Sequence, residues 1–577
     1  MKGSSPFPAG GSGQLLGYPR QTKSPDTLVR TRRRRGCGEG GSTGVSTTTD
    51  SGPPQSRVQP TNEPTPPGRH VGVLGWIAAV ASVVSVLLMM AVAVSGPSSA
   101  VPKLPRTWPV PPLWFPVHPG EVRVAAMVYA MVLLGTVGVV CGLIAVRRGA
   151  RPNMRLLLPA AVAAVALLTL LPPAGSTDSL SYAAYGRIAA IGHSPYRMTP
   201  EQLRLSGDPV GRYTPRSWRD EPSLYGPVAT ATEWAAAELG GSSMARIVFW
   251  LKLLSSVAFG AVAFALDRLL RGDPAARARA HLLWTVNPLM IWDVVAGAHC
   301  DGLAAGLGFL GLVCIRPRLT RGGASAKAGR APSPRIGQAV AAGLLIGAAA
   351  AVKAPYALLG IGPVWAARHS LRALAAMAVG AILVIVPGYL IVGHAAVRDL
   401  AIGSSLVAFD SFWRLIYHPF GFASYSTPAG LMHIAELLCV AMAALLAGRL
   451  PRGLQQLPAI RPALVVMLAW LLLWPMQRPW YDAIAFCMLA VFPASRLDWL
   501  LLVRQVPTVI VMATGVVIPI RPAWLRNIGR FMGGTVTPAV LLACVVATVL
   551  LCVVGAWQLR KLPPGPLAGL PAPGDAG

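Results

Sequence analysis

Charged residues are scarce in this sequence. Only 13% of its 577 residues are Asp, Glu, Lys or Arg, while 54% are hydrophobic and the mean hydropathy is +0.54. Soluble globular domains contain about 25% charged residues, so this composition excludes a soluble chain. It predicts an all-α polytopic membrane protein, because a helix that crosses a bilayer satisfies its own backbone polar groups.

Acidic residues are especially few. There are 22 Asp and Glu against 51 Lys and Arg, so the formal net charge is +29. In a soluble chain this excess would suggest a nucleic-acid partner. Here the basic residues occur in short clusters between apolar runs, which is typical of residues that set membrane topology. We therefore expect membrane lipid around the chain and no nucleic acid.

Paired cysteines are also lacking. None of the eight cysteines belongs to a CxxC pair or to a Cys/His spacing typical of metal sites. Most lie within apolar runs, where a cysteine behaves as a small core residue. We expect neither a disulfide framework nor a bound metal, and no cofactor; a requirement for a divalent metal is left open.

The N-terminus has no signal peptide pattern. Residues 1–70 are rich in Gly, Ser, Thr, Pro and Arg and lack apolar periodicity, as disordered segments do. The first apolar run, Val71 to Val94, begins far from the start and matches the roughly 20 residues that span a bilayer. We predict a disordered basic tail and then a retained helix, with about fourteen spans in the whole chain.

The longest polar insertion between apolar segments runs from Asp178 to Pro227. It opens with a carboxylate directly after the apolar run that ends at Pro172-Pro173, and it mixes acids with Tyr, His and Arg. Charged side chains at a membrane boundary are costly unless they are paired or functional. Asp178 is therefore a candidate functional residue, and the alternative is a solvated start of a loop.

The basic clusters predict an orientation. If the N-terminal tail is cytoplasmic, the basic loops near residues 147–155, 268–279, 316–335, 368–372, 449–461 and 560–561 fall on the same side, as the positive-inside rule requires. Arg521, Arg526 and Arg530 are the exception, on the other side. This orientation makes both termini cytoplasmic and the insertion that begins at Asp178 extracytoplasmic.

The same orientation places further polar clusters on the extracytoplasmic side. Asp301 lies in AHCDGL, Lys353 in VKAPY, and Arg478 in MQRPWYD. Each alone fits a helix cap or a side chain that snorkels to the interface. Together they predict a site where acid, base and cation converge. Such a site suits a lipid-linked phosphosugar, whose leaving phosphate needs cations and whose acceptor hydroxyl needs a general base.

Five motifs in this order resemble the actinobacterial GT-C polyprenol-phosphate-mannose-dependent α-1,6-mannosyltransferases that build lipomannan. They are DSLSYAAYGR with the following HSPYR, SLYGP, NPLMIWDVVAGAHCDGL, AVKAPY and WPMQRPWYD. The likeness covers about Leu156 to Phe492, and the tail and the last two spans do not take part. One position departs from it, because Cys300 stands where we expect Asn in relatives.

The resemblance implies a GT-C-type membrane glycosyltransferase with about 14 transmembrane helices and a large first extracytoplasmic catalytic loop. It would transfer mannose from polyprenyl phosphate mannose to a glycolipid or lipomannan acceptor, with inversion and an α-1,6 linkage, in the cell membrane. The sequence has no nucleotide-binding glycine pattern, which is consistent with a lipid-phosphate donor.

The resemblance also implies roles for individual residues. Asp178 would be the general base. Among the other carboxylates, position in the chain makes Asp301 the second choice ahead of Asp220 and Glu221, because it is expected to cap a helix and they lie in a loop. Lys353 and Arg478 would bind the donor phosphate. The residues expected to contact sugar or acceptor are Tyr182, Tyr185, His193, Tyr225, His299, Trp480 and Tyr481.

The expected domain organisation follows from these patterns. Residues 1–70 form the basic tail, 71–155 two additional transmembrane helices, and 156–495 the GT-C-like catalytic module. Residues 496–560 form C-terminal transmembrane helices, and 561–577 a Pro/Gly-rich tail.

Three alternatives stay open. A GT-C transferase for another polyprenyl-phosphate sugar, such as arabinose, fits the same motifs because none of them reads the sugar directly. A lipid-linked sugar transporter or flippase would show internal repeats, and we find none. A scaffold protein without chemistry would not need acids and cations gathered on one side.

The orientation predicts which loops are accessible from outside the cell. In intact cells, an impermeant maleimide should label Ser206→Cys, which lies in the extracytoplasmic insertion. It should label Ser325→Cys, in the loop between Arg316 and Arg335, only after the membrane is opened. The parent chain measures the background from its own cysteines. The reverse pattern would contradict the orientation.

Overall fold

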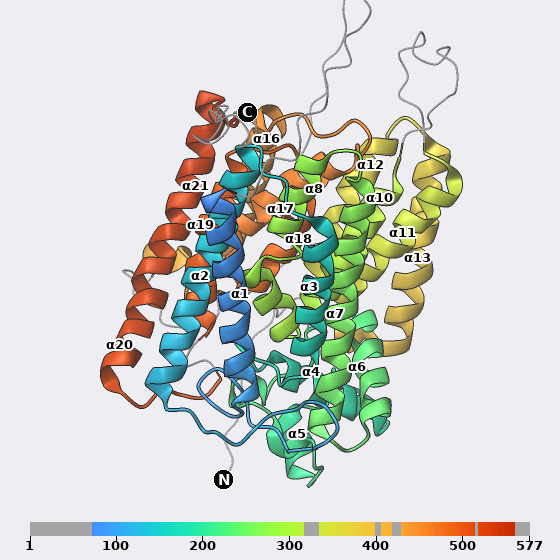
Figure 1. Cartoon of the computed structure of the whole chain (residues 1–577). Coiled ribbons are helices and arrows are strands. Elements are labelled where there is room, and N and C mark those ends of the chain that lie inside the picture. The colour runs from blue at the N-terminus through green and yellow to red at the C-terminus, as the bar shows by residue number, and fades with distance from the viewer. Residues whose placement is uncertain (1–71, 317–333, 399–405, 418–428, 514–516, 560–577) are drawn as a thin grey trace, which may run out of the picture. The chain divides into compact units, whose positions relative to one another are not determined.

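The computed structural model describes residues 72–316, 334–398, 406–417, 429–513 and 517–559. Most of these residues are helical and no β-strand occurs among them, which confirms the predicted all-α fold (Figure 1). The predicted tails, 1–70 and 561–577, lie outside the described residues. The described residues belong to one compact unit, Pro66–Gly577, and the division of that unit at 155 and 495 stays a prediction.

Six described helices are long and apolar enough to cross a membrane. A bent pair, Pro288–Ala296 and Cys300–Cys314, adds a seventh span if it is counted as one. Shorter apolar helices occupy Met154–Thr169, Ile336–Val352, Ala354–Ala367, Ile460–Leu473 and Pro479–Val491. The described helices therefore make a membrane protein, while the predicted number of about fourteen spans stays a prediction.

The first two helices, α1 (Val73–Val94) and α2 (Glu121–Arg147), pack closely as a pair. Small residues permit this approach, because a Cβ atom at Gly138 would collide with Ser82 on α1. The hydroxyl of Ser85 also donates across the pair to the carbonyl of Met131 at 2.7 Å. Short backbone distances with a crossing hydrogen bond are a common way to hold helices together in lipid.

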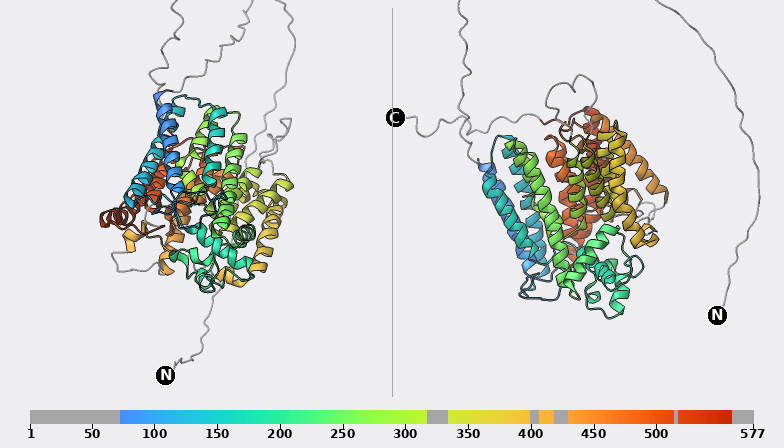
Figure 2. Two further views of the ribbon diagram at one scale, coloured as in Figure 1. Left: turned by 60° about the horizontal axis from the view of Figure 1, so that its bottom comes forward. Right: turned by 90° about the vertical axis from the view of Figure 1, so that its right-hand side faces the viewer.

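The predicted catalytic loop is itself largely helical. After α3 (Met154–Thr169), the chain forms α4 (Asp178–Ala190), α5 (Pro200–Leu205), two short 3₁₀ turns and α6 (Pro227–Gly240). Thr199 and Gln202 make a reciprocal capping box with Pro200 at the first position of α5, a strong local start signal. These helices gather at one end of the described bundle (Figures 1 and 2).

A sharp break divides the middle of the chain. α7 (Met244–Leu269) leads to α8 (Pro274–Leu283), α9 (Pro288–Met290) and the π-helical η3 (Ile291–Ala296). The axis then turns by 111° before α10 (Cys300–Cys314). At the turn Ala298 has φ of 55°, in the left-handed region that residues other than Gly rarely adopt. Such strained positions often mark functional sites.

The second half supplies the remaining helices around this break. They are α11 (Ile336–Val352), η5 (Ala354–Gly360), α12 (Ile361–Ala367), α13 (Leu371–Val392), α15 (Trp413–Tyr417), α16 (Ala429–Arg449), α17 (Ile460–Leu473), η7 (Pro479–Tyr481), α18 (Asp482–Val491), α19 (Leu497–Ala513), α20 (Ala523–Phe531), η8 (Met532–Val536) and α21 (Thr537–Val554). α17 and α18 are buried along almost their whole length, so the segment between them lies inside the bundle.

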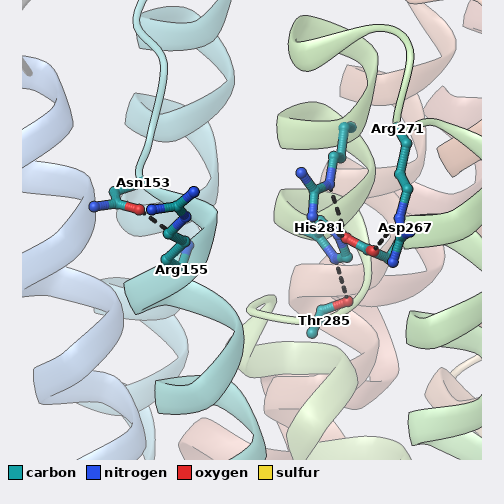
Figure 3. A network of polar contacts seen from close by, with 7 residues as sticks. Asn153, Arg155, Asp267, Arg271, His281 and Thr285 are labelled. Atoms are coloured by element: carbon teal, nitrogen blue, oxygen red, sulfur yellow. Dashed lines mark hydrogen bonds and ion pairs between the residues drawn. The ribbon is translucent and has the colours of Figure 1, made fainter.

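A polar network joins α7 to α8 at the end of the bundle opposite α4 and α5 (Figures 1 and 3). Asp267 accepts hydrogen bonds from Arg277 at 2.7 and 2.5 Å and from Arg271 at 3.4 Å. His281 lies 3.3 Å from Asp267 and 2.8 Å from Thr285. Nearby, Figure 3 shows the cap of α3, where Asn153 accepts the Arg155 N–H at 3.0 Å. The contacts of Asp267 hold the corner between α7 and α8, after which the chain runs toward the break.

Candidate active site

Asp178 is the first residue of α4, so its carboxylate lies at a helix N-terminus, where negative charge is stabilised. Its backbone N–H donates to the Ser176 hydroxyl at 3.1 Å. Before it, the buried Lys252 donates to the carbonyls of Leu171 and Pro172 at 2.8 and 3.0 Å. Only 17% of the Asp178 side chain is exposed. The segment before Asp178 is therefore held in place, while part of the Asp178 side chain stays open, as a catalytic acid or base requires.

His299 approaches Asp178 from the break before α10. Its Nδ1 lies 3.5 Å from Asp178 Oδ2, longer than a well-formed hydrogen bond. The imidazole stacks on Trp480, with ring centroids 3.6 Å apart and planes 14° apart. Both rings are buried. Because the stack fixes the ring plane, one edge of the imidazole stays directed at the Asp178 carboxylate.

Lys353 and Asp301 form a buried ion pair. Lys353 Nζ lies 2.9 and 3.1 Å from the two oxygens of Asp301, and Tyr356 donates to Oδ1 at 3.1 Å. The ammonium also lies 4.1 Å from the ring centroid of Tyr481, close enough for a cation–π contact. Asp301 is fully buried. Both of its carboxylate oxygens are occupied, whereas Asp178 keeps exposed surface.

Arg478 brings a second cation to the cluster. Its Nη1 donates to Asp410 Oδ1 at 3.3 Å and to the backbone oxygen of Gln477 at 3.0 Å. Asp410 is fully buried, and its Oδ2 has no hydrogen-bond partner in the described part of the chain. The Arg478 side chain is 14% exposed, so it is not fully enclosed by the protein.

Burial and the neighbouring cations shift the pKa of Asp178 in opposite directions. Burial raises the pKa of this carboxyl above its ordinary value, while the positive charges of Arg478 and Lys353 oppose the rise and Asp301 adds to it. The net shift is upward. A carboxylate with a raised pKa is a stronger base, provided that the pH stays high enough to keep it ionised.

Tyr182, Tyr225 and Cys300 form the adjoining wall. The two tyrosine rings meet edge to face at 5.1 Å, and the Tyr225 hydroxyl lies 3.4 Å from that of Tyr182. Cys300 Sγ is 3.7 Å from the same Tyr182 hydroxyl. The position where we expected Asn in relatives therefore faces a tyrosine of the cluster, and a thiol there is a weaker hydrogen-bonding group than an amide.

Two other residues that the sequence predicted as sugar contacts, Tyr185 and His193, have different surroundings. Tyr185 is buried on α4, but its hydroxyl donates to the backbone oxygen of Glu221 at 3.1 Å, so it ties α4 to the following segment. His193 is exposed in the turn after α4. Asp220 and Glu221 have exposed side chains. The proposed sugar contacts of Tyr185 and His193 stay predictions.

Sequence reasoning overlooked two polar residues of this region. Tyr356 lies three residues after Lys353 in the AVKAPY motif, and its place in that motif could have marked it as a site residue. Glu233 on α6 is buried beside Tyr182, and neither carboxylate oxygen has a partner among the described residues. Burial raises the pKa of Glu233 to about 8. No described group of three or more His, Cys, Asp or Glu side chains is arranged to hold a metal ion.

The Lys353–Asp301 pair predicts a stability effect. Lys353→Ala should lower the free energy of unfolding by about 3 to 5 kcal/mol, because it leaves the Asp301 charge buried without its partner. Combining Lys353→Ala with Asp301→Asn should recover most of this loss. Chemical denaturation of the detergent-solubilised chain measures it, with the exposed Lys103→Ala as the matched control. An equal loss in the single and double variants would contradict the pairing argument.

The sequence matches a family model described as "Alpha-(1->6)-mannopyranosyltransferase, N-terminal domain" over residues 78–369. This range contains Asp178, His299, Asp301 and Lys353, and it ends before Arg478. No solved structure matches the chain.

Curated relatives agree with the family model. A protein of Mycolicibacterium smegmatis described as a probable alpha-(1->6)-mannopyranosyltransferase is 33% identical over 141 residues, which cover 24% of this chain and 25% of that protein. An alpha-(1->6)-mannopyranosyltransferase of Mycobacterium tuberculosis is 30% identical over 145 residues, 25% of this chain and 24% of that protein. Alpha-(1->6)-mannopyranosyltransferase B of Corynebacterium glutamicum is 28% identical over 148 residues, 26% of this chain and 25% of that protein.

These matches span about a quarter of the length of each relative. The family model is broader, because it extends over half of this chain, from the first helix to the residues just beyond α12. The polar cluster around Asp178 comes largely from that half. The chain belongs to the alpha-(1->6)-mannopyranosyltransferase family.

Proposed function

We propose that the chain transfers mannose from polyprenyl phosphate mannose to a glycolipid or lipomannan acceptor, with inversion at the anomeric carbon and an α-1,6 linkage, on the extracytoplasmic face of the cell membrane. Family membership supports mannosyl transfer. One observation carries the choice of site: a partly exposed carboxylate, Asp178, lies among two cations and a stacked aromatic pair.

The reaction is a single displacement. The acceptor hydroxyl gives its proton to the Asp178 carboxylate, and its oxygen attacks the anomeric carbon of the donor. The bond from that carbon to the phosphate oxygen breaks, and polyprenyl phosphate leaves with the electron pair. Attack on the face opposite the phosphate converts a β-linked donor into an α-linked product. No covalent enzyme intermediate is required.

Asp178 is preferred over Asp301 as the base on grounds of access. Asp301 is fully buried, and its oxygens are engaged by Lys353 and Tyr356. Asp178 keeps part of its side chain exposed, and the nearby His299 ring can orient it or share its charge. The raised pKa of Asp178 increases its proton affinity in the ground state, which favours proton transfer from a hydroxyl as the C–O bond forms.

Arg478 and Lys353 are the proposed partners of the donor phosphate. Negative charge develops on the leaving phosphate, and fixed cations in a site with little water stabilise it strongly. Arg478 is the better placed of the two, because its guanidinium has five N–H donors and its contacts with Asp410 and Gln477 use only Nη1. Lys353 contributes charge at longer range while it stays paired with Asp301. The half-buried ring of Tyr225 is the most open aromatic group beside these cations, whereas Trp480 and Tyr481 are covered by His299 and Lys353; a sugar would reach Trp480 and Tyr481 at their edges.

The base assignment predicts the effect of removing one charge. Asp178→Asn should reduce turnover by about 10²- to 10⁴-fold, roughly 3 to 5 kcal/mol of barrier, because the amide cannot accept the proton. Binding of the donor should persist, since Asn has the same shape. Turnover is measured in membranes with a radiolabelled donor.

The matched control is Asp220→Asn, an exposed carboxylate in the same polar segment, which should keep parental turnover. Asp178→Glu should also be poor, because the extra methylene moves the carboxylate from its place. Parental turnover in Asp178→Asn, with a loss in Asp301→Asn, would make Asp301 the base.

The donor assignment is tested with the purified chain in lipid nanodiscs. Polyprenyl phosphate [¹⁴C]mannose should label a mannan-bearing glycolipid acceptor, while GDP-mannose should not, and Asp178→Asn should remove the signal. Linkage analysis of the product should give an α-1,6 bond. Transfer only from polyprenyl phosphate arabinose would contradict mannose as the donor sugar. Transport of the donor across the membrane without transfer would contradict a transferase reaction.

A further inference from the structure

Three residues of the candidate site come from one irregular segment. Arg478, Trp480 and Tyr481 lie in residues 474–482, which lead from α17 to the first residue of α18, Asp482, and before Asp482 are helical only in the short turn η7. Regular helix therefore does not hold the backbone of this segment in place. Its side chains nevertheless make specific contacts, with Asp410 and His299 among them. Contacts with residues outside this segment must therefore hold its backbone in place.

A single guanidinium from α19 bonds the residues on either side of 478–481. Arg504 is fully buried. Its Nη1 donates to Asp482 Oδ1, just after the site residues, and its Nη2 donates to Gln477 Oε1, just before them. The same Nη2 lies 3.2 Å from the carbonyl of Leu471 in the last turn of α17. One planar group thus joins the end of α17, the segment and the start of α18.

Stability alone gives little reason for this charge pair. Removing two ions from water costs several kcal/mol for each, so apolar residues of similar volume often stabilise a buried site equally well. The pair also leaves polar atoms unsatisfied among the described residues, namely Arg504 Nε and Asp482 Oδ2. An ion pair of this kind is more easily explained by the geometry that it imposes than by its energy.

We propose that Arg504 is a positioning residue for the candidate site. Its guanidinium holds Gln477 and Asp482, on either side of residues 478–481, so that Arg478 faces Asp410, Trp480 stacks on His299, and Tyr481 lies under Lys353. The role of these three side chains in mannosyl transfer rests on the proposed function. The positioning of residues 478–481 by Arg504, hereafter the clamp, does not.

The fork of the guanidinium is the essential feature. Lysine carries the same charge but offers one nitrogen, so it cannot bond Gln477 and Asp482 with separate, fixed N–H groups. Arg504→Lys keeps a cation beside the buried Asp482 and removes the geometry. A displacement of about 1 Å at a reacting group can cost roughly 100-fold in rate.

A second buried arginine, Arg279 on α8, is paired with an acid of α19 and provides the matched control. Arg279 donates to both oxygens of Asp498, at 2.8 and 2.5 Å, and to the carbonyl of Phe492 at 2.8 Å. Asp498 is on α19, like Arg504, and Arg279 is also buried. Its contacts are with the far end of α18 and not with residues 474–482. Arg279→Lys therefore makes the same chemical change away from the site.

The first measurement does not depend on activity. In the full chain in nanodiscs, hydrogen–deuterium exchange of a peptide covering residues 474–482 should be at least about tenfold faster in Arg504→Lys than in the parent. Arg279→Lys should leave this peptide unchanged. Unchanged exchange in Arg504→Lys, or equal acceleration in both variants, overturns the clamp. This readout stands even if the parent transfers no mannose, so the two proposals can fail separately.

The second measurement follows transfer from the donor that the parent uses. Arg504→Lys should reduce kcat/KM by about 10- to 100-fold, and Arg279→Lys by less than about twofold. In a double-mutant cycle with Arg478→Ala, the further loss caused by Arg504→Lys should be much smaller than in the parent, because Arg504 acts through the segment that bears Arg478. Losses that simply multiply overturn the proposal.

A milder variant covers the case in which Arg504→Lys does not fold. Gln477→Ala frees one end of the segment and keeps the Arg504–Asp482 pair. It should accelerate exchange of residues 474–482 and reduce kcat/KM in the same direction by a smaller factor. Parental values for both quantities in Gln477→Ala would overturn the clamp.

Discussion

The buried ion pair between Asp301 and Lys353 is the contact on which the site depends. Asp301 is the second residue of α10, directly after the break, and Lys353 caps the C-terminus of α11. A charge in this apolar interior is costly unless a partner of opposite charge and hydrogen bonds offset its removal from water. Tyr356 supplies a further hydrogen bond to Asp301. The pairing of Asp301 with Lys353 joins α10 to the end of α11 and brings the Lys353 ammonium over the ring of Tyr481.

The same requirement divides the carboxylates of the cluster into different roles. Asp301 is paired with Lys353, and Asp410 with Arg478, so both are committed to neighbouring cations. Asp178 lies 3.5 Å from the His299 ring, is not in contact with either cation among the described ion pairs, and remains partly exposed. Burial raises its pKa although two cations lie nearby. Three acids of one type thus differ in their partners and in their access because of their surroundings, and such differences commonly separate the roles of catalytic carboxylates.

The break between η3 and α10 explains why these groups meet inside the bundle. A continuous helix would carry residues 297–299 past the site, whereas the 111° turn directs His299 inward, against Trp480. The facing segment, residues 474–482, is irregular as well. Backbone that is not helical at membrane depth is tolerated where it is enclosed by protein or lines a cavity. Buried side chains such as Arg504 and Gln477 supply the hydrogen bonds that regular helix would otherwise provide.

Hydropathy and charge by themselves determined the helical membrane class, because apolar helices are the simple solution for a chain with so few charges. Motif order predicted that Asp178, His299, Lys353 and Arg478 belong together, although they are 300 residues apart at the extremes. Family likeness carried that prediction, since spacing along the chain says nothing about distance across a bundle.

Tertiary structure decided which member of each motif reaches the site. Tyr182 and His193 are equally plausible in sequence, but only Tyr182 lies on the face of α4 that meets Tyr225, while His193 falls in an exposed turn. Pairing is likewise invisible in sequence. Asp301 and Asp178 differ because one meets Lys353 and Tyr356 and the other meets neither at bonding distance. These contacts join segments far apart in the chain, and the packing of the helices alone brings them together.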